Sequence, residues 1–274
     1  MTTPPPEKVV HLNRYYHFTE LMRDPAIEGE LLRYESAHDG TMQSVLILQP
    51  AAQRSEKLFF FFHGMDGDIG DGVVVRDVVK RLNATVVTMG GRGPAWLSTS
   101  FLADAQQVIR DRKVGFPDYY LIGVSMGGTQ ALALAGLLPD ELRQSVAGVI
   151  ALIPGVNLPA LVEGSANERV RNTVRDSVNG DLAQLQQRSP IQVMSQYKAG
   201  LPFVIFHNQQ DTLLLTDELE DFITSLRSVG HPVTTFSVPG DHNFTYENFD
   251  FREAFGKLGT DSVQKGAPLL SNER

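Results

Sequence analysis

Short apolar runs alternate with amphipathic segments along most of this chain. The apolar runs cover residues 58–62, 85–89, 119–124, 146–152, 202–207 and 233–238. The segments with apolar residues at helical spacing cover 72–82, 102–112, 129–138, 217–229 and 247–258. Strands and helices that alternate at this spacing are typical of βαβ units. We therefore predict an α/β fold with a mostly parallel central sheet and helices on both of its faces.

A hairpin is expected ahead of this series. Residues 31–36 and 43–48 both suit strands, and they flank a turn that contains Asp39-Gly40. Asp-Gly between two such runs favours a tight reversal of the chain, and Pro50 then ends the second strand. The two strands would pair antiparallel, so we place this hairpin at an edge of the sheet.

One stretch, residues 156–190, interrupts the alternation. It has few apolar residues at strand spacing and is rich in Gln, Asn, Arg and Glu. It forms either a short helical lid over the functional edge of the sheet or an elaborated loop. Because long insertions in compact domains are often functional, we favour the lid. We expect residues 1–8 to be a mobile tail and the whole chain, 1–274, to form a single domain.

Composition excludes several classes of function. The formal net charge of −8, with no cluster of Lys and Arg, disfavours nucleic acid as a partner. The chain has no cysteine, which excludes disulfides, a thiol nucleophile and a thiolate zinc site. No apolar run is long enough to span a bilayer, and the first residues lack the pattern of a secretory signal. We therefore expect a cytoplasmic protein, although a mature secreted chain with its signal removed would look similar.

The most informative motif is Gly123-Val124-Ser125-Met126-Gly127, which directly follows an apolar strand and precedes a helix. Strand, sharp turn and helix in this order are what a nucleophile elbow needs, and this setting favours a catalytic serine over a structural loop. Glycine on either side lets neighbouring backbone approach the turn, which leaves Ser125 projecting above the sheet. The start of the helix offers free N–H groups to a developing oxyanion.

A serine nucleophile needs a base, usually a histidine held by a carboxylate. His242 follows the last predicted strand, and Asp211 follows the strand before it. Both loops belong to the carboxyl edge, where α/β sheets place their ligands. Asp217 and Asp241 are competing acids, but Asp217 suits a helix start and Asp241 adjoins the histidine. His231 begins a strand at the opposite edge, and we expect it at the surface.

The order Ser125, Asp211, His242 resembles that of the α/β-hydrolase superfamily, and the likeness extends from the hairpin to the last helix. In that family, backbone N–H groups after the nucleophile and after an earlier strand form an oxyanion hole. The resemblance implies that Met126 and Met65 supply these amides here. His63, next to that second loop, is expected to brace it by hydrogen bonds.

Three further sequence features resemble prolyl-oligopeptidase-like and dienelactone-hydrolase-like esterases. They are the Asp39-Gly40 hairpin, Ser189-Pro190, and the segment 240–244, Gly-Asp-His-Asn-Phe. The segment 89–96, together with Ser-Met-Gly-Gly, resembles esterase-D and the mycolyltransferases. The chain departs from the family pattern at His207-Asn208, where a glycine usually precedes the acid-bearing loop.

Two residues after the strand at 85–89 are candidates for a substrate pocket. Arg92 either meets a substrate carboxylate or lies at the surface, and we favour the surface role. Trp96, the single tryptophan, either walls an acyl pocket or anchors its loop. The acidic loop around Asp66, Asp68 and Asp71 does not match the spacing of a calcium loop, so we expect no metal site.

These features predict a serine hydrolase that cleaves a carboxylic ester or thioester, with no cofactor. Its partner would be a small-molecule acyl substrate, and the oligomeric state stays open. The same residues would also serve an acyltransferase, which passes the acyl group to an alcohol or amine. A peptidase is a third reading, although such enzymes of this superfamily often carry an additional domain. A non-catalytic binding protein with this fold would be expected to lack one of the three catalytic residues.

Overall fold

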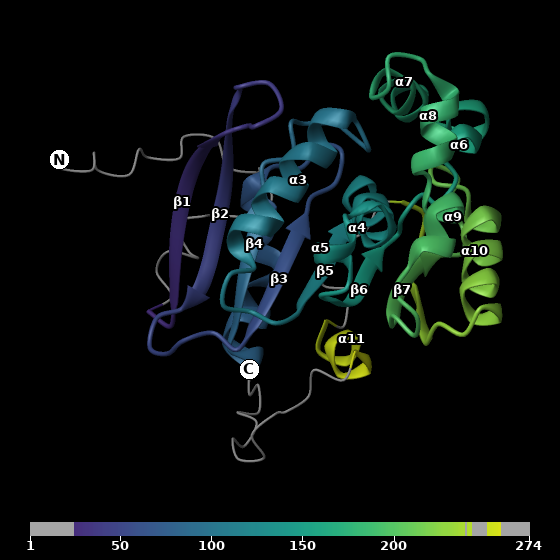
Figure 1. Ribbon diagram of the computed structural model, residues 1–274. Coiled ribbons are helices and arrows are strands. Elements are labelled where there is room, and N and C mark those ends of the chain that lie inside the picture. The colour runs from purple at the N-terminus through teal and green to yellow at the C-terminus, as the bar shows by residue number, and fades with distance from the viewer. Residues whose placement is uncertain (1–24, 239, 243–250, 259–274) are drawn as a thin grey trace.

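The computed structural model describes residues 25–238, 240–242 and 251–258. Its described strands form one eight-stranded sheet in the order β1-β2-β4-β3-β5-β6-β7-β8. Figure 1 shows the strands from β1 to β7 side by side in this order. The strands are β1 (Ile27–Glu35), β2 (Met42–Pro50), β3 (Lys57–Phe62), β4 (Ala84–Met89), β5 (Tyr119–Val124), β6 (Val146–Leu152), β7 (Phe203–Asn208) and β8 (Val233–Val238). From β4 to β8 every neighbouring pair is parallel, as the alternation of strand and helix predicts.

The predicted hairpin is present at the edge of the sheet. Strand β1 pairs antiparallel with β2, and β2 pairs antiparallel with β4. The turn between β1 and β2 includes more residues than Asp39-Gly40, because the backbone N–H of Ser36 donates a hydrogen bond to the carbonyl oxygen of Thr41 across it. Gly40 adopts a φ of 72°, the left-handed conformation that favours glycine.

Helices pack against both faces of the sheet, and each face has its own apolar core. Side chains of α3 (Thr99–Arg112), α4 (Met126–Leu137) and α10 (Thr216–Ser228) pack with Phe60 and Phe62 on one face. Side chains of α2 (Arg76–Leu82) and α11 (Phe251–Lys257) pack with Phe59 and Phe61 on the other. The phenylalanine run of β3 is buried on both sides, which is typical of a central parallel strand.

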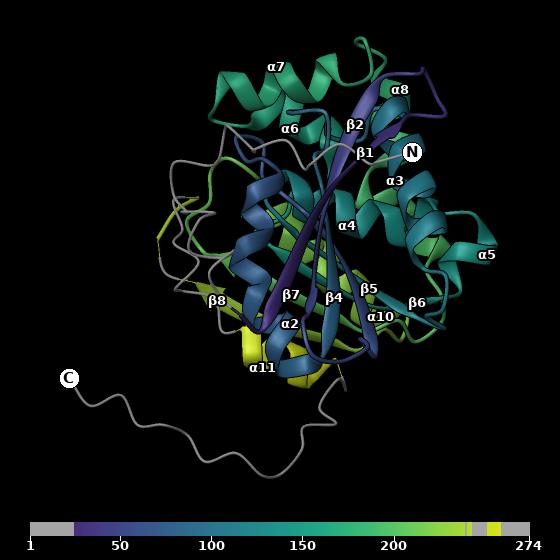
Figure 2. The ribbon, with the colours of Figure 1, turned by 90° about the vertical axis from the view of Figure 1, so that its left-hand side faces the viewer.

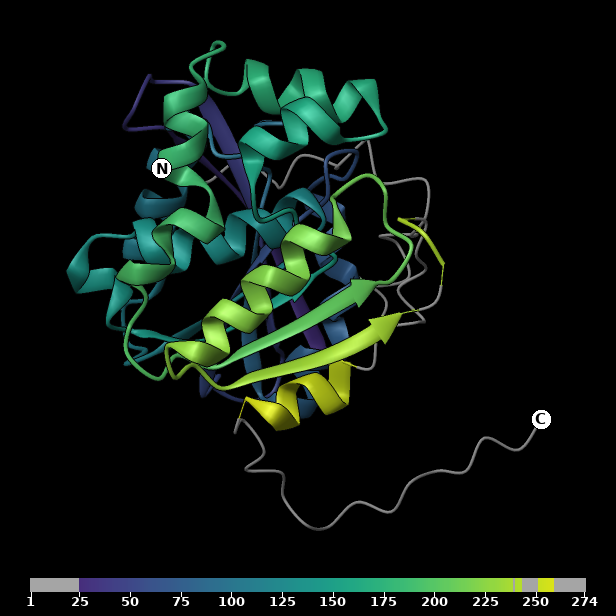
Figure 3. The same cartoon turned by 90° about the vertical axis from the view of Figure 1, so that its right-hand side faces the viewer.

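Residues 156–190 are mostly helical. They contain α6 (Leu158–Gly164), α7 (Glu168–Asp176) and α8 (Leu182–Arg188), and α9 (Pro190–Val193) begins at their end. Figures 1, 2 and 3 all show α6, α7 and α8 grouped beyond one end of the sheet. We call these three helices the helical cap. That the cap moves as a lid stays a prediction.

Several details differ from the sequence prediction. The helix predicted at 72–82 begins as a 3-10 helix, η1 (Ile69–Val75), and continues as α2. Two short helices and a 3-10 turn were not predicted: α5 (Asp140–Arg143), α9 and η2 (Met194–Gln196). His231 is buried, so its predicted surface position is wrong; its Nδ1 lies 3.2 Å from the carbonyl oxygen of Leu201. The predicted tail, 1–8, and the start of the last predicted helix, 247–250, lie outside the described residues.

Within the described residues, no helix combines the length and hydropathy that crossing a membrane requires.

Candidate active site

The turn between β5 and α4 is a strained elbow. Ser125 adopts φ 54° and ψ −117°, a conformation that side chains rarely tolerate. Added β-carbons would lie 1.9 Å from the Gly127 carbonyl oxygen at position 123 and 2.0 Å from the Phe62 carbonyl oxygen at position 127. Only glycine is compatible with either contact, which explains both glycines of the motif. The strained turn leaves the Ser125 residue 9% exposed.

A chain of hydrogen bonds leads away from this serine. Ser125 Oγ lies 2.9 Å from Nε2 of His242, and Nδ1 of His242 lies 2.7 Å from Oδ2 of Asp211. The three side chains come from the loops after β5, β7 and β8, at the carboxyl edge of the sheet. The structure therefore brings together the three residues selected from the sequence.

Asp211 is held firmly in this arrangement. Its second oxygen, Oδ1, accepts hydrogen bonds from the backbone N–H groups of Leu213 and Leu214, at 2.9 and 3.0 Å. These bonds orient Oδ2 toward the histidine. Asp217 lies in the first turn of α10, as its sequence context predicts.

Asn208 is a site residue that the sequence did not reveal. It is buried at the end of β7, and its Nδ2 donates to the backbone carbonyl oxygen of Asp241, next to His242. The hydroxyl of Thr216 donates to the backbone carbonyl of Asn208 at 2.9 Å. The departure from the family pattern at this position thus provides a tie between the acid loop and the histidine loop. The only signal in the sequence was that departure itself.

Met65 and Met126, the two residues expected to form an oxyanion hole, lie in adjoining segments. Met126 is the first residue of α4, where the backbone N–H has no partner within the helix. The 64–65 loop lies beside the elbow, since a β-carbon on Gly64 would be 3.8 Å from Cβ of Ser125. No hydrogen bond to another described residue occupies either methionine amide. Both donors are thus free to bind a developing oxyanion.

The helical cap contacts this loop through Thr173 of α7. The Thr173 hydroxyl lies 3.2 Å from Sδ of Met65 and accepts a hydrogen bond of 3.0 Å from Nε1 of Trp96. A second contact is the ion pair between Arg169 and Asp66, at 2.6 Å. The cap therefore borders the candidate active site directly.

Trp96 and Arg92, the two candidate pocket residues, both make internal contacts. Trp96 is 1% exposed, and its backbone carbonyl accepts a bond of 2.8 Å from the Gln130 side chain. It therefore anchors both its own loop and α7. The Arg92 guanidinium binds Asp39 of the hairpin turn at 2.6 and 2.9 Å, and Asp104 of α3 at 2.5 and 3.2 Å. Two carboxylates occupy the donors that a substrate carboxylate would need, which favours a structural role for Arg92.

His63 braces the 64–65 loop, as its sequence position predicts. Its Nδ1 lies 2.7 Å from the carbonyl oxygen of Gly64, and its Nε2 lies 3.1 Å from that of Gly90. Asp71 is buried nearby, and its burial raises the pKa of this carboxyl to about 6. The negative charge of Asp68 acts in the same direction, and the neighbouring His63 opposes it.

The acidic residues of this region do not gather into a metal site. Asp66 pairs with Arg169, and Asp68 accepts a hydrogen bond from the backbone N–H of Gly70 at 2.7 Å. Across the part of the chain that the structure describes, no three residues of types His, Asp and Glu are arranged to hold a metal ion.

Comparison with known structures identifies the fold. FphF, a fluorophosphonate-binding serine hydrolase of Staphylococcus aureus, superposes with a TM-score of 0.68 at 18% identity, over 85% of this chain and 98% of that one. The chain has the α/β-hydrolase fold. An esterase of Pyrobaculum calidifontis matches with a TM-score of 0.68 at 18% identity, over 90% and 89% of the two chains.

Longer proteins match this α/β-hydrolase fold as well. A Pyrococcus horikoshii acylaminoacyl peptidase has a TM-score of 0.68 at 14% identity, over 92% of this chain but only 45% of the peptidase. No family model matches the sequence, and no curated protein matches it. At these identities the likeness establishes the fold, and the case for an activity has to come from the site.

Proposed function

We propose that this protein is a serine hydrolase that cleaves a carboxylic ester or thioester through an acyl-enzyme on Ser125. The observation that carries the proposal is the continuous relay of hydrogen bonds, 2.9 and 2.7 Å long, that joins Ser125, His242 and Asp211. An activated serine needs a base within hydrogen-bond reach, and the base needs a partner that orients it. The fold supports the same proposal, and two of its structural neighbours are described as a serine hydrolase and an esterase.

The reaction would proceed in two steps. Ser125 Oγ attacks the acyl carbon while its proton passes to Nε2 of His242, and the backbone amides of Met65 and Met126 bind the oxyanion. His242 then gives that proton to the departing oxygen or sulfur atom. In the second step His242 takes a proton from water, the resulting hydroxide attacks the acyl carbon, and Ser125 leaves with the proton restored. Asp211 stabilises the charged histidine in both steps.

The decisive experiment is labelling of the native protein with a fluorophosphonate probe, followed by peptide mass spectrometry to locate the adduct. We expect a single adduct on Ser125. The Ser125→Ala variant should lose the label and should lower kcat on a p-nitrophenyl ester by about 10⁴-fold or more. Ser100→Ala is the matched control, because Ser100 is a half-buried serine outside the relay and should keep full labelling.

Two other outcomes would change the conclusion. A folded protein that takes up no label, and whose Ser125→Ala variant loses no activity, would favour the non-catalytic binding protein. A labelled protein that forms a new ester or amide when an alcohol or amine is supplied would be an acyltransferase. Product analysis by mass spectrometry, with and without such an acceptor, separates transfer from hydrolysis. A peptidyl substrate in the same assay tests the peptidase reading.

A further inference from the structure

A pocket lies at the opposite edge of the sheet from Ser125. It has a volume of about 330 Å³, which is within the range of small-molecule sites. Its walls come from the end of β2, the first residues of β3 and β4, the loop at 53–55, the end of α3 and Phe116. The chain runs from Leu58 at the pocket to Gly64 beside the elbow. At a rise of about 3.3 Å per residue, this segment separates the two sites by roughly 20 Å. The pocket shares no residue with the relay.

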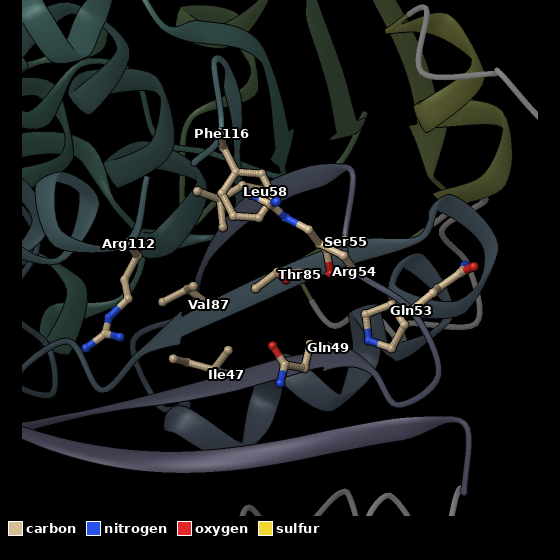
Figure 4. A pocket seen from close by; sticks show the side chains of 11 residues that line it. Ile47, Gln49, Gln53, Arg54, Ser55, Leu58, Thr85, Val87, Arg112 and Phe116 are labelled. Carbon is tan, nitrogen blue, oxygen red and sulfur yellow. Dashed lines mark hydrogen bonds between the residues drawn. The ribbon is translucent and has the colours of Figure 1, made fainter. Parts of the chain in front are cut away.

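The pocket has an apolar floor between polar walls. Figure 4 shows the strand side chains Ile47, Thr85 and Val87 between Arg112 on one side and the 53–55 loop on the other. Leu58 and Phe116 add further apolar surface. Burying such surface against a hydrocarbon group is favourable by about 0.8 kcal/mol per methylene. The floor is therefore suited to the apolar body of a small molecule.

The charge of this pocket is positive. Arg54 and Arg112 both line it, and among the described residues that line it there is no Asp or Glu. Glu56 and Asp111 are next to them in the sequence but do not line the pocket. Among the described residues neither arginine has an ion pair, whereas Arg110 on the same helix pairs with Glu141. Two guanidinium groups at one cavity without a carboxylate favour an anionic occupant. This local charge is the reverse of the net charge of the chain, which is −8.

We propose that this pocket binds an amphipathic carboxylate, a small molecule with a carboxylate head and an apolar body. The head would lie between Arg54 and Arg112, where guanidinium groups can donate paired hydrogen bonds to it. The body would lie along the floor of Ile47, Leu58 and Val87. This proposal goes beyond the proposed hydrolase and does not depend on it.

The test is isothermal titration of the full chain with octanoate. We expect saturable binding, weakened about tenfold or more in Arg54→Gln and in Arg112→Gln, because each variant loses charged hydrogen bonds. Octanamide, which has the same body without the charge, should bind more weakly than octanoate. Each methylene removed from the alkyl chain of octanoate should weaken its binding to the pocket about fourfold.

Arg110→Gln is the matched control, because it removes the same charge from the same helix outside the pocket. Arg54 is exposed and Arg112 is half-buried, so all three variants should fold, which circular dichroism can check. Octanoate affinity that is unchanged in the Arg54→Gln/Arg112→Gln double variant would place the ligand elsewhere, for example beside Ser125, and would overturn the proposal. The absence of binding, or equal affinity for octanamide, would overturn it as well.

Discussion

At the scale of single residues, the relay was readable from the sequence because its members stand at strand ends. Ser125, Asp211 and His242 each follow an apolar strand, and parallel strands bring their carboxyl ends to one edge. Asn208 and Thr173 were not readable in this way. Their roles depend on which distant atom each polar group meets, Asp241 in one case and Trp96 in the other, and a single sequence does not encode such pairings visibly.

Asn208 should act as a positioning residue for His242. In Asn208→Ala the loop that carries the histidine loses its tie to β7, and a small displacement of a catalytic base lowers the rate steeply. We expect kcat to fall by about tenfold to a hundredfold with little change in KM. Asn208→Asp should be worse, because a carboxylate would face the Asp241 carbonyl. Gln210→Ala, an exposed change in the same loop, is the control. A rise in KM alone would contradict this role.

Asp71 should make the stability of the fold depend on pH. Its pKa is raised by burial from 3.8 to about 6, so the folded chain binds this proton more tightly than the unfolded chain between those values. The contribution of Asp71 to stability therefore falls as pH rises through this window and stays low above it. Relative to the native chain, Asp71→Asn should gain free energy of unfolding between pH 4 and pH 7, by up to about 3 kcal/mol.

Urea unfolding curves at several pH values measure this difference for Asp71→Asn. Asp111→Asn serves as the control, because Asp111 is an exposed carboxylate on α3 and should shift the curve little at any pH. A gain for Asp71→Asn that is the same at pH 4 and pH 7 would show that burial of the charge is not its cause.

At the scale of elements, the strands were predicted with nearly their observed bounds, whereas the helical cap was predicted only as a short helical lid within residues 156–190, without its individual helices. Each parallel strand is a compact apolar run bounded by polar residues, which is a strong local signal. Helix α7 buries only Val170 and Val174 and is otherwise polar, so its pattern resembles that of a loop. Helix α4 is hard to orient from its sequence for the opposite reason. Almost all of its residues are buried, so no polar face indicates which side faces the sheet.

Thr173 should contribute more to holding the helical cap in place than the ion pair between Arg169 and Asp66 does. Thr173→Val keeps the shape of the side chain but leaves the buried Trp96 N–H without a partner, which costs about 1 to 3 kcal/mol. Arg169 and Asp66 are each 59% exposed, and exposed pairs contribute at most about 1 kcal/mol. We therefore expect Thr173→Val to lower the free energy of unfolding and kcat/KM more than Arg169→Gln does.

Chemical denaturation and ester hydrolysis measure the two effects of Thr173→Val. Ser177→Ala is the matched control, because among the described residues the Ser177 hydroxyl bonds only to the Val174 carbonyl of α7 itself. If Arg169→Gln has the larger effect, the cap is held mainly by charge and the role assigned to Thr173 is wrong.

At the scale of the whole molecule, the two edges of the sheet present different chemistry. The carboxyl edge holds the relay and the helical cap, and the amino edge holds the positively charged pocket. Arg92 joins the turn of the N-terminal hairpin to α3 through Asp39 and Asp104, and Ser36 of the same turn also donates a hydrogen bond to Asp104. The alternation of strands and helices predicted this architecture. It did not predict the charged pocket, whose arginines lie in a loop and at a helix end.

The separation of the relay residues along the chain has a consequence for the order of folding. Ser125 and His242 are 117 positions apart, and His242 and Asp211 are 31 apart. Contacts between such distant positions form late, because long loops must close first. A partly folded chain, even with β5 and α4 in place, would expose a serine no more reactive than any other. Chemical reactivity at Ser125 would thus be among the last properties that a newly made chain acquires, once β8 has joined the sheet.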